Sequence, residues 1–266
     1  MGWEPALRLG VFLGVFALMA AWERTAPKRR LRESKPRRWS TNWAMAIIDT
    51  AVVRLLFPLA AVGAALDAQA QGWGLFHAAG APFWLAFAVT LLAMDFAIWL
   101  QHLVTHKVPL LWRLHQVHHA DPDIDVTTAI RFHPVEIALS MLLKIGLVYG
   151  LGAPAAAVVA FEVILNGMAM FNHANIRLSP RLDRWLRLVV VTPDMHRVHH
   201  SVERREHDAN YGFNLSVWDR LFGVYLAQPE KGHEGMEIGL KPWRHGEPAR
   251  LGFSLALPFR PLKPDA

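Results

Sequence analysis

Five apolar stretches set the fold that this chain can adopt, because each is about as long as a membrane helix. They cover residues 6–22, 43–66, 83–101, 135–150 and 154–172. A bilayer core is crossed by a helix of about 20 apolar residues, and only helices and closed barrels satisfy their backbone groups inside it. Hydrophobic residues make up 53% of the chain and charged residues 19%, against about 25% charged in soluble chains. The sequence therefore predicts an all-α, multi-pass membrane helical bundle.

A basic run at residues 23–38 predicts which way the bundle faces. It holds eight Lys or Arg and two Glu, and such charge beside a membrane helix usually marks the cytoplasmic side. We therefore expect an uncleaved first span with its N-terminus outside, an outer loop at residues 67–82, and a chain that stays cytoplasmic after about residue 173. The last two apolar stretches form a hairpin that either spans or re-enters the membrane. The run is short and lacks interleaved aromatic residues, so it does not favour binding of nucleic acid.

The histidines are the candidate functional residues, because eight of the 14 lie in three short clusters. The clusters are His102 and His106; His115, His118 and His119; and His196, His199 and His200. Spacings of three and four residues place imidazoles on one face of a helix, where they can share a metal ion. Zinc takes about four protein ligands, so eight imidazoles indicate two ions. The chain has no cysteine, and all-nitrogen sites suit redox iron as well as zinc.

Further residues are assigned from their positions beside these clusters. Asp95 lies seven residues before His102 on the same helical face, so we expect it to orient a metal-binding histidine. Thr192 and Pro193 fit the first positions of the helix that carries the third cluster. The isolated histidines are expected to be ordinary surface residues; these are His77, His207, His233 and His245.

The order and spacing of the clusters resemble a known family. They are followed by Asn210-Tyr211-Gly212 and by Trp218-Asp219-Arg220-Leu221-Phe222-Gly223. Over residues 90–226 the pattern resembles the fatty acid hydroxylase/sterol desaturase superfamily. The resemblance implies a membrane-embedded, all-helical, di-iron and O2-dependent oxidoreductase that acts on lipids. It also implies three parts: membrane spans with a basic cytoplasmic loop at 1–82, a catalytic domain at 83–226 whose cytoplasmic helical lobe carries a histidine-rich di-metal site, and a polar tail at 227–266.

The resemblance adds residues to the expected site. His173 stands where family members place a further metal ligand, which brings the expected ligands to nine. The hydroxylase branch has a second histidine four residues later, where this chain has Arg177. Asn172 or Asn175 is the alternative, as a ligand or as a group that holds water. His133, in an Arg-x-His-Pro motif, is expected at a helix start or beside a ligand rather than on a metal ion.

The segment after the third cluster is expected to serve packing. Tyr211, Trp218 and Phe222 would pack the C-terminal lobe against the metal-binding helices, and a lipid-facing aromatic set is the alternative. Asp219 and Arg220 are expected to pair with each other.

The implied reaction is the hydroxylation or desaturation of a lipid (sterol, fatty acyl, ether lipid or amino lipid) with O2 as co-substrate. Two iron ions are the expected cofactors, and zinc can replace them in purified protein. No cytochrome b5 domain, dinucleotide fingerprint or cysteine is present, so a separate electron donor such as a ferredoxin or cytochrome is expected. The expected location is the bacterial inner membrane with the active site on the cytoplasmic side. The alternatives are a histidine-rich metal transporter and a zinc-dependent membrane hydrolase.

Overall fold

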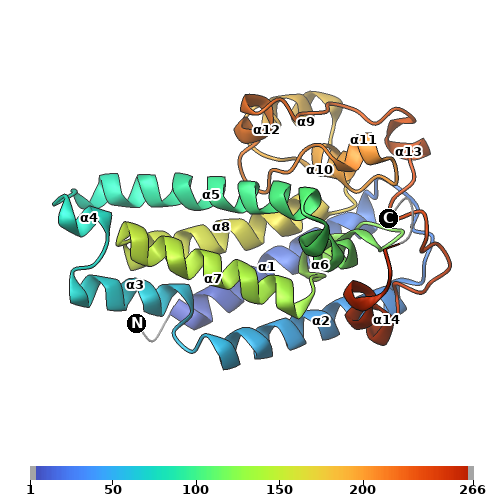
Figure 1. Ribbon diagram of the computed structural model, residues 1–266. Coiled ribbons are helices and arrows are strands. Elements are labelled where there is room, and N and C mark those ends of the chain that lie inside the picture. The colour runs from blue at the N-terminus through green and yellow to red at the C-terminus, as the bar shows by residue number, and fades with distance from the viewer. Residues whose placement is uncertain (1–3, 263–266) are drawn as a thin grey trace.

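Long helices lie side by side through most of the molecule, and short helices gather at one end of them (Figure 1). The computed structural model describes residues 4–262, and these residues form helices and three isolated bridges but no strand. Within this range, five helical segments are long and apolar enough to cross a membrane, with α2 to α4 counted as one. The prediction of an all-α, multi-pass membrane bundle is confirmed. The helices of the bundle are α1 (Glu4–Thr25), α2 (Lys35–Leu56), α3 (Ala60–Gln71), α4 (Leu75–Ala78), α5 (Phe83–Lys107), α7 (Pro134–Leu151) and α8 (Ala155–His173).

The second apolar stretch is broken into two helices instead of forming one continuous span. The break between α2 and α3 falls at residues 57–59, because Pro58 lacks the N–H that a continuing helix needs and restricts the residue before it. α3 then runs to Gln71 and ends at Gly72, whose φ of 68° is one that glycine adopts without strain. Residues 67–71, which were expected in an outer loop, are therefore helical.

α7 and α8 form the expected hairpin, and it runs the length of the bundle. Gly152 ends α7 with a φ of 67°, and Pro154 precedes α8. The turn packs near α3 and α4: the hydroxyl of Tyr149 donates a hydrogen bond of 2.7 Å to Asp67, and its ring lies 5.9 Å from that of Trp73. A hairpin that reaches the opposite end of the other long helices fits a crossing rather than a re-entrant segment (Figure 1).

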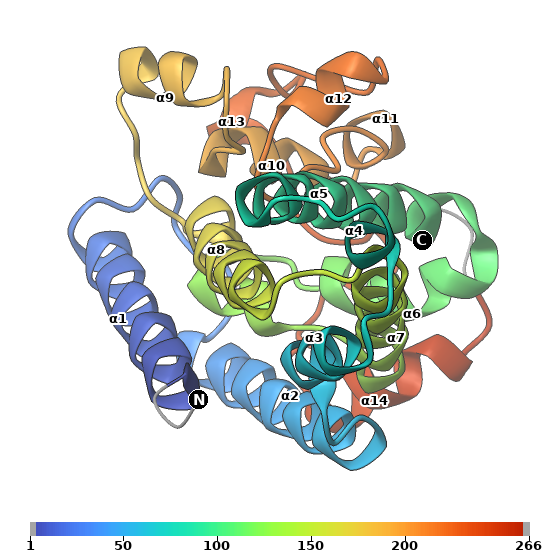
Figure 2. The same cartoon turned by 90° about the vertical axis from the view of Figure 1, so that its left-hand side faces the viewer.

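One end of the bundle collects both the basic run and the histidine clusters. α1, α5 and α8 end there, and α2 and α7 begin there (Figures 1 and 2). Alanines keep the other half of the bundle tight: Ala61, Ala64 and Ala65 of α3 are buried in one apolar cluster with Phe161 of α8. The arrangement agrees with the expectation that all the histidine clusters lie on the same side as residues 23–38.

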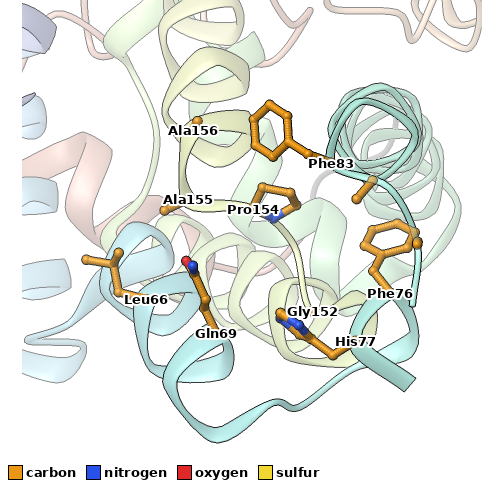
Figure 3. Close-up of a pocket in the computed structure, with 11 residues that line it drawn as sticks. Leu66, Gln69, Phe76, His77, Phe83, Gly152, Pro154, Ala155 and Ala156 are labelled. Carbon is orange, nitrogen blue, oxygen red and sulfur yellow. The ribbon is translucent and has the colours of Figure 1, made fainter. Parts of the chain in front are cut away.

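The far end of the bundle holds a pocket of about 380 Å³ (Figure 3). It is lined by Phe76, Phe83 and Pro154, together with the polar side chains of Gln69 and His77. Because the histidine clusters lie at the other end of α5, this pocket is separate from them.

Short helices build a lobe at the histidine end. The C-terminal segment, expected as a polar tail, contributes to the core of this lobe. Leu240, Phe253 and Leu257 are buried in one cluster with Met45 of α2 and Trp112 of α6. The tail therefore packs back on the bundle, because its apolar residues are removed from water at this contact. The helices of the lobe are α6 (Pro109–His119), η1 (Val126–Ile130), α9 (Pro180–Leu186), α10 (Pro193–His199), α11 (Arg204–His207), α12 (Val217–Leu221), α13 (Gly232–Gly235), α14 (Leu251–Ala256) and η2 (Leu257–Phe259).

Candidate metal centre

Nine buried histidines meet in two groups. They come from α5, α6, α8 and α10 with its C-terminal neighbour. In each group the facing ring nitrogens lie within 4.8 Å of one another. The structure thus brings the three predicted clusters together with His173. The first group is His102, His106, His115, His119 and His199, and the second is His118, His173, His196 and His200.

Each His-x-x-His-His motif serves both groups. Successive residues of an α-helix point about 100° apart, so neighbouring histidines turn away from each other. His118 joins the second group while His119 joins the first, and His199 and His200 divide in the same way. Thr192 caps the start of α10, as predicted, and so fixes where the third cluster begins.

Backbone carbonyls fix how four of the rings are turned. A carbonyl only accepts hydrogen bonds, so a ring nitrogen that contacts one must carry the proton. In a neutral ring with Nδ1 protonated, Nε2 then holds a lone pair. The Nδ1–carbonyl contacts are His102 to Tyr211 (2.7 Å), His199 to Ala209 (2.8 Å), His118 to Arg131 (3.1 Å) and His173 to Ala169 (2.7 Å).

The lone pairs of these rings point at one another. Nε2 of His102 lies 2.9 Å from Nε2 of His199, and Nε2 of His118 lies 3.1 Å from Nε2 of His173. Burial, and then neighbouring imidazoles, lower the pKa values of His118 and His199, so an extra proton does not relieve the repulsion. A bound cation does relieve it. Two ligands at a right angle on a metal with bonds of about 2.1 Å lie roughly 3 Å apart, so the residues fit metal ions.

Other ring nitrogens in the two groups have no hydrogen-bond partner in the part of the chain that the structure describes. More than about 90% of buried polar groups are paired in folded proteins. The rings that carry these unpaired atoms belong to both groups, and each ring can offer one nitrogen to a metal ion. The unpaired atoms are Nδ1 and Nε2 of His106, Nε2 of His119, Nδ1 of His196 and Nε2 of His200.

Glu136 belongs to the site, although no motif pointed to it. Its Oε1 lies 2.6 Å from Nδ1 of His115, whose Nε2 lies 3.0 Å from Nε2 of His102. A carboxylate on the far nitrogen of a ligand histidine fixes the ring and raises its basicity. The signal in the sequence was a lone acid at the start of the apolar stretch 135–150, where a charge is costly unless it has a partner.

We expect Glu136→Gln to lower metal affinity or activity about 10–100-fold, because the amide lacks the charge that polarises His115. Metal retention against a chelator and product formation would be measured on the same sample. Glu203→Gln is the matched control, since Glu203 pairs at the surface with Lys231 and Lys241. Equal metal retention in the two variants would contradict the role assigned to Glu136.

Asp95 does not orient a histidine, which corrects the expectation. Its Oδ2 accepts a hydrogen bond of 2.8 Å from Nε1 of Trp218, so it ties α5 to α12. Seven residues of α-helix rise about 10 Å, so Asp95 lies two turns from His102 even though the two share a face. The contact with Glu136 fills the role that was expected of Asp95.

His207 is also corrected, because it is buried instead of lying at the surface. Its ring stacks on Trp112 at 5.5 Å and lies 5.9 Å from the ring of His106. With Asp208 and His106 it forms a third set of possible ligand atoms. α11 places His207 beside the first group, and the sequence did not indicate this because no second histidine stands three or four residues from His207.

The remaining isolated histidines behave more nearly as expected. His77 and His245 are exposed, and His233 is half-buried. His133 caps α7 by accepting a hydrogen bond of 3.3 Å from the backbone N–H of Val135, which confirms its placement at a helix start.

The amides beside His173 make backbone contacts. Asn175 accepts a hydrogen bond of 3.0 Å from the N–H of Arg29 and donates one of 2.8 Å to its carbonyl, so it holds the basic run in place. Asn172 donates to the carbonyl of Phe213 at 2.9 Å. Arg177 is exposed.

The segment around Asp219 packs the lobe on α5, as expected for its aromatic residues. Asp219 accepts hydrogen bonds of 2.9 Å from Nε1 of Trp99 and 2.8 Å from the N–H of Tyr211. Phe222 stacks on Trp99 at 4.6 Å. Arg220 donates to a backbone carbonyl instead of to Asp219, so the expected ion pair is wrong.

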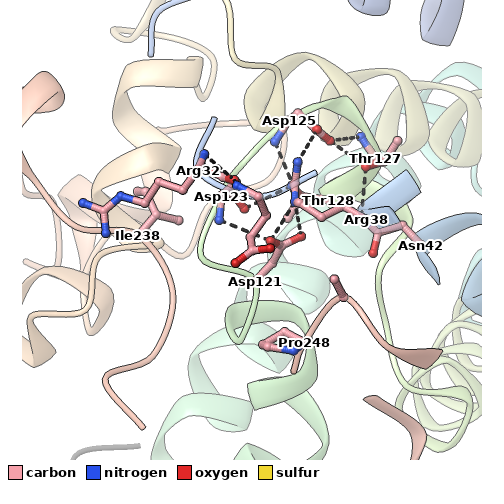
Figure 4. A network of polar contacts seen from close by, with 12 residues as sticks. Arg32, Arg38, Asn42, Asp121, Asp123, Asp125, Thr127, Thr128, Ile238 and Pro248 are labelled. Atoms are coloured by element: carbon pink, nitrogen blue, oxygen red, sulfur yellow. Dashed lines mark hydrogen bonds and ion pairs between the residues drawn. The ribbon is translucent and has the colours of Figure 1, made fainter. Parts of the chain in front are cut away.

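A buried charge network clamps the end of α6 to the start of α2 (Figure 4). Arg38 contacts Asp121 at 2.8 Å and Asp125 at 2.6 Å, and all three side chains are buried. Arg131 joins the network by donating a hydrogen bond of 2.8 Å to Asn42. Because these residues flank the second histidine cluster, the network holds that cluster in position.

Comparison with known proteins places the chain in a family. Residues 87–224, just over half of the chain, match the family model described as fatty acid hydroxylase, and the chain belongs to this family. No solved structure matches the chain.

Three relatives show what the chain is similar to. The ornithine lipid hydroxylase OlsE of Rhizobium tropici is 27% identical over 234 residues, which cover 82% of this chain and 67% of that protein. The alkylglycerol monooxygenase of Homo sapiens is 31% identical over 140 residues, 53% of this chain and 30% of that protein. The fatty acid hydroxylase vlmA of Lecanicillium sp is 27% identical over 179 residues, 61% and 48% of the two chains. The chain thus spans less than half the length of two of these relatives.

Proposed function

We propose that the protein is a membrane lipid hydroxylase that uses O2 and holds two iron ions in the two histidine groups. The observation that carries the proposal is the set of rings whose Nδ1 atoms are anchored and whose Nε2 atoms face one another at 2.9–3.1 Å. Two iron ions bound there would supply the oxidation of a C–H bond by O2, which no side chain of the chain can perform. The relatives named as hydroxylases and monooxygenases support hydroxylation over desaturation.

The substrate is an amphipathic lipid, and amino lipids and ether lipids are the first classes to test. Both follow from the names of the relatives, an ornithine lipid hydroxylase and an alkylglycerol monooxygenase. The histidine groups lie at one end of apolar helices, so a chain that enters from the membrane can reach them with its headgroup in the interface. Electrons would come from a separate ferredoxin or cytochrome, since the chain lacks cysteine for an iron–sulfur cluster.

Phe213 is the side chain that would meet the lipid at the metal centre. Its ring lies 4.8 Å from the ring of His102 and 5.8 Å from that of His196, so it touches one histidine of each group. It is half-buried, although the nine histidines are buried. It also packs against two apolar clusters of the bundle, the one that contains Phe161 and a second that contains Met170 and Ala174. We assign it to hold the substrate chain beside the ions and to exclude water.

We expect Phe213→Ala to retain its metal ions and to lower kcat/KM roughly 10–200-fold, because removing apolar atoms that touch a substrate in its pocket costs about 1–3 kcal/mol. The position of the new hydroxyl should also become less uniform. Phe259→Ala is the control, since Phe259 is 75% exposed. Unchanged kinetics and product would show that Phe213 does not touch the substrate.

The histidine end is proposed to face the cytoplasm of a bacterium, because the basic run lies at that end. A reporter fused after residue 266 should then be found inside, and one inserted near residue 72 should be found outside. A periplasmic C-terminus would reverse the orientation without changing the chemistry.

The proposed reaction is tested by comparing total lipids from deletion and complemented strains by mass spectrometry. A gain of one oxygen atom, labelled when labelled O2 is supplied, would support hydroxylation. A loss of two hydrogens would show desaturation instead. Lipids unchanged by the gene, together with no O2 consumption, would overturn the proposal in favour of a zinc hydrolase or a metal transporter. Zinc in purified protein would not decide the native metal.

A further inference from the structure

The lobe carries an exposed apolar face on α9, on the segment that follows it and on the end of α12. Large exposed apolar patches on a folded protein mark an interaction surface. Trp185 and Leu221 are each 68% exposed. The expectation that the chain stays cytoplasmic after about residue 173 does not by itself account for this face. Its residues are Leu182, Trp185, Leu188, Val189, Leu221 and Phe222.

Backbone contacts join the two parts of this α9–α12 face. The N–H of Ser216 donates a hydrogen bond of 3.0 Å to the carbonyl of Val189, and its hydroxyl donates one of 2.8 Å to the carbonyl of Arg187. α12 lies at the end of the lobe nearer the far end of the bundle (Figure 1), and α9 lies on the same outer side of the lobe but nearer α1 and α8 (Figure 2). The face therefore lies beside the membrane-crossing helices.

The depth of this face is fixed by its contacts with α5. Trp218 donates a hydrogen bond of 2.8 Å to Asp95, near the middle of this helix of 25 residues. Phe222 stacks on Phe96 at 5.9 Å. Twelve residues of α-helix separate Asp95 from Lys107, a rise of roughly 18 Å. Side chains that contact the middle of a membrane-crossing helix lie at membrane depth, so the α12 end of the face lies beside α5 at that depth, and α9 is joined to it through Ser216.

Arginines flank the apolar residues. Arg181 and Arg184 of α9 are exposed, and neither forms an ion pair within residues 4–262. Arginine stems lie along apolar surface while the guanidinium reaches headgroups, and anionic lipids attract such charges. Trp185, between apolar and basic residues, suits the membrane interface.

We propose that the α9–α12 face inserts into the membrane leaflet that surrounds the histidine end of α5, with Arg181 and Arg184 on anionic headgroups. The partner is thus a lipid surface. The lobe is anchored to the bilayer beside the metal centre instead of lying free in water. The proposal goes beyond the proposed function, because it concerns the membrane contact of the lobe and not its reaction.

The absence of cysteine allows single cysteines to carry a fluorescent label. Full-length Trp185→Cys and Leu221→Cys would be placed in vesicles of phosphatidylcholine with phosphatidylglycerol and exposed to two quenchers. One is a nitroxide on a lipid acyl chain, and the other is iodide in water. Leu92→Cys, on an exposed position of α5, reports the membrane, and Lys231→Cys, beside α13, reports water.

We expect the labels at 185 and 221 to follow Leu92→Cys, with strong quenching by the nitroxide lipid and less iodide quenching than Lys231→Cys. Iodide quenching equal to that of Lys231→Cys would overturn the proposal. Protection from both quenchers that disappears on diluting the protein in lipid would also overturn it, because a second copy would then cover the face. No activity is measured, so the outcome is independent of the proposed reaction.

The headgroup contact has its own comparison. Combining Arg181→Gln and Arg184→Gln should raise iodide quenching at the Trp185→Cys label in vesicles with phosphatidylglycerol, and leave it unchanged in pure phosphatidylcholine. If iodide quenching in vesicles with phosphatidylglycerol were the same with and without the two arginines, the role assigned to them would be contradicted.

Discussion

Replacing His199 with alanine should abolish product formation and lower the metal content below two ions per chain. His199 belongs to the first group, and its Nε2 lies 2.9 Å from that of His102, so its loss removes a nitrogen from the point where the ring lone pairs converge. A redox site that needs both ions cannot keep partial activity. Metal analysis and lipid hydroxylation would be measured on purified protein in membranes.

His245→Ala is the control for this result, because His245 is exposed and distant in sequence from every cluster. His207→Ala is the sharper comparison, since His207 is buried beside His106 but stacks on Trp112. Each group has four or five nitrogens without it, so we expect two ions to remain. If His207→Ala lost a metal ion as His199→Ala does, the first group would have to include α11.

Arg38→Met should destabilise the protein by about 3–5 kcal/mol, because it leaves buried carboxylates without their partner charge. Asp121 and Asp125 contact Arg38 at 2.8 and 2.6 Å, and Arg38 is fully buried. Unfolding of the protein in detergent, induced by heat or by denaturant, would measure the loss of stability. Metal retention should fall as well, since the network holds the second histidine cluster.

Arg37→Met provides the matched control for the charge network. Arg37 precedes Arg38 in α2 but is exposed, and surface substitutions stay within about 0.5 kcal/mol. Replacing Asp121 and Asp125 with Asn in the Arg38→Met background should recover part of the stability, because the two carboxylates that paired with Arg38 are then neutral. Equal stability of Arg37→Met and Arg38→Met would rule out the clamp.

The features of the site that depend on local residue spacing could be predicted from the sequence. The three clusters and His173 could be assigned to one site because helical periodicity and the family pattern place such rings together. Asp95 was assigned wrongly because periodicity gives the face of a helix but not the distance along it. Glu136 and Arg38 act through partners 21 and 83 residues away, and a single sequence does not reveal such pairings.

The predictions about the bundle and the tail that were wrong also have local causes. Hydropathy runs smoothly through Pro58, so the break between α2 and α3 was overlooked although the proline itself predicts one. The tail after residue 227 has too few apolar residues to form a span, yet Leu240 and Phe253 are buried in one apolar cluster with Met45 and Trp112. Composition averages conceal such isolated anchors.

Two pairs of adjacent histidines join the two histidine groups. His118 and His119 serve different groups, as do His199 and His200, and adjacent Cα atoms are about 3.8 Å apart. In the proposed two-metal site, a single peptide unit would therefore link the two ions at two places, without an intervening loop. Under this proposal, differences in substrate range would arise away from the histidines, at side chains such as Phe213 and at the α9–α12 face.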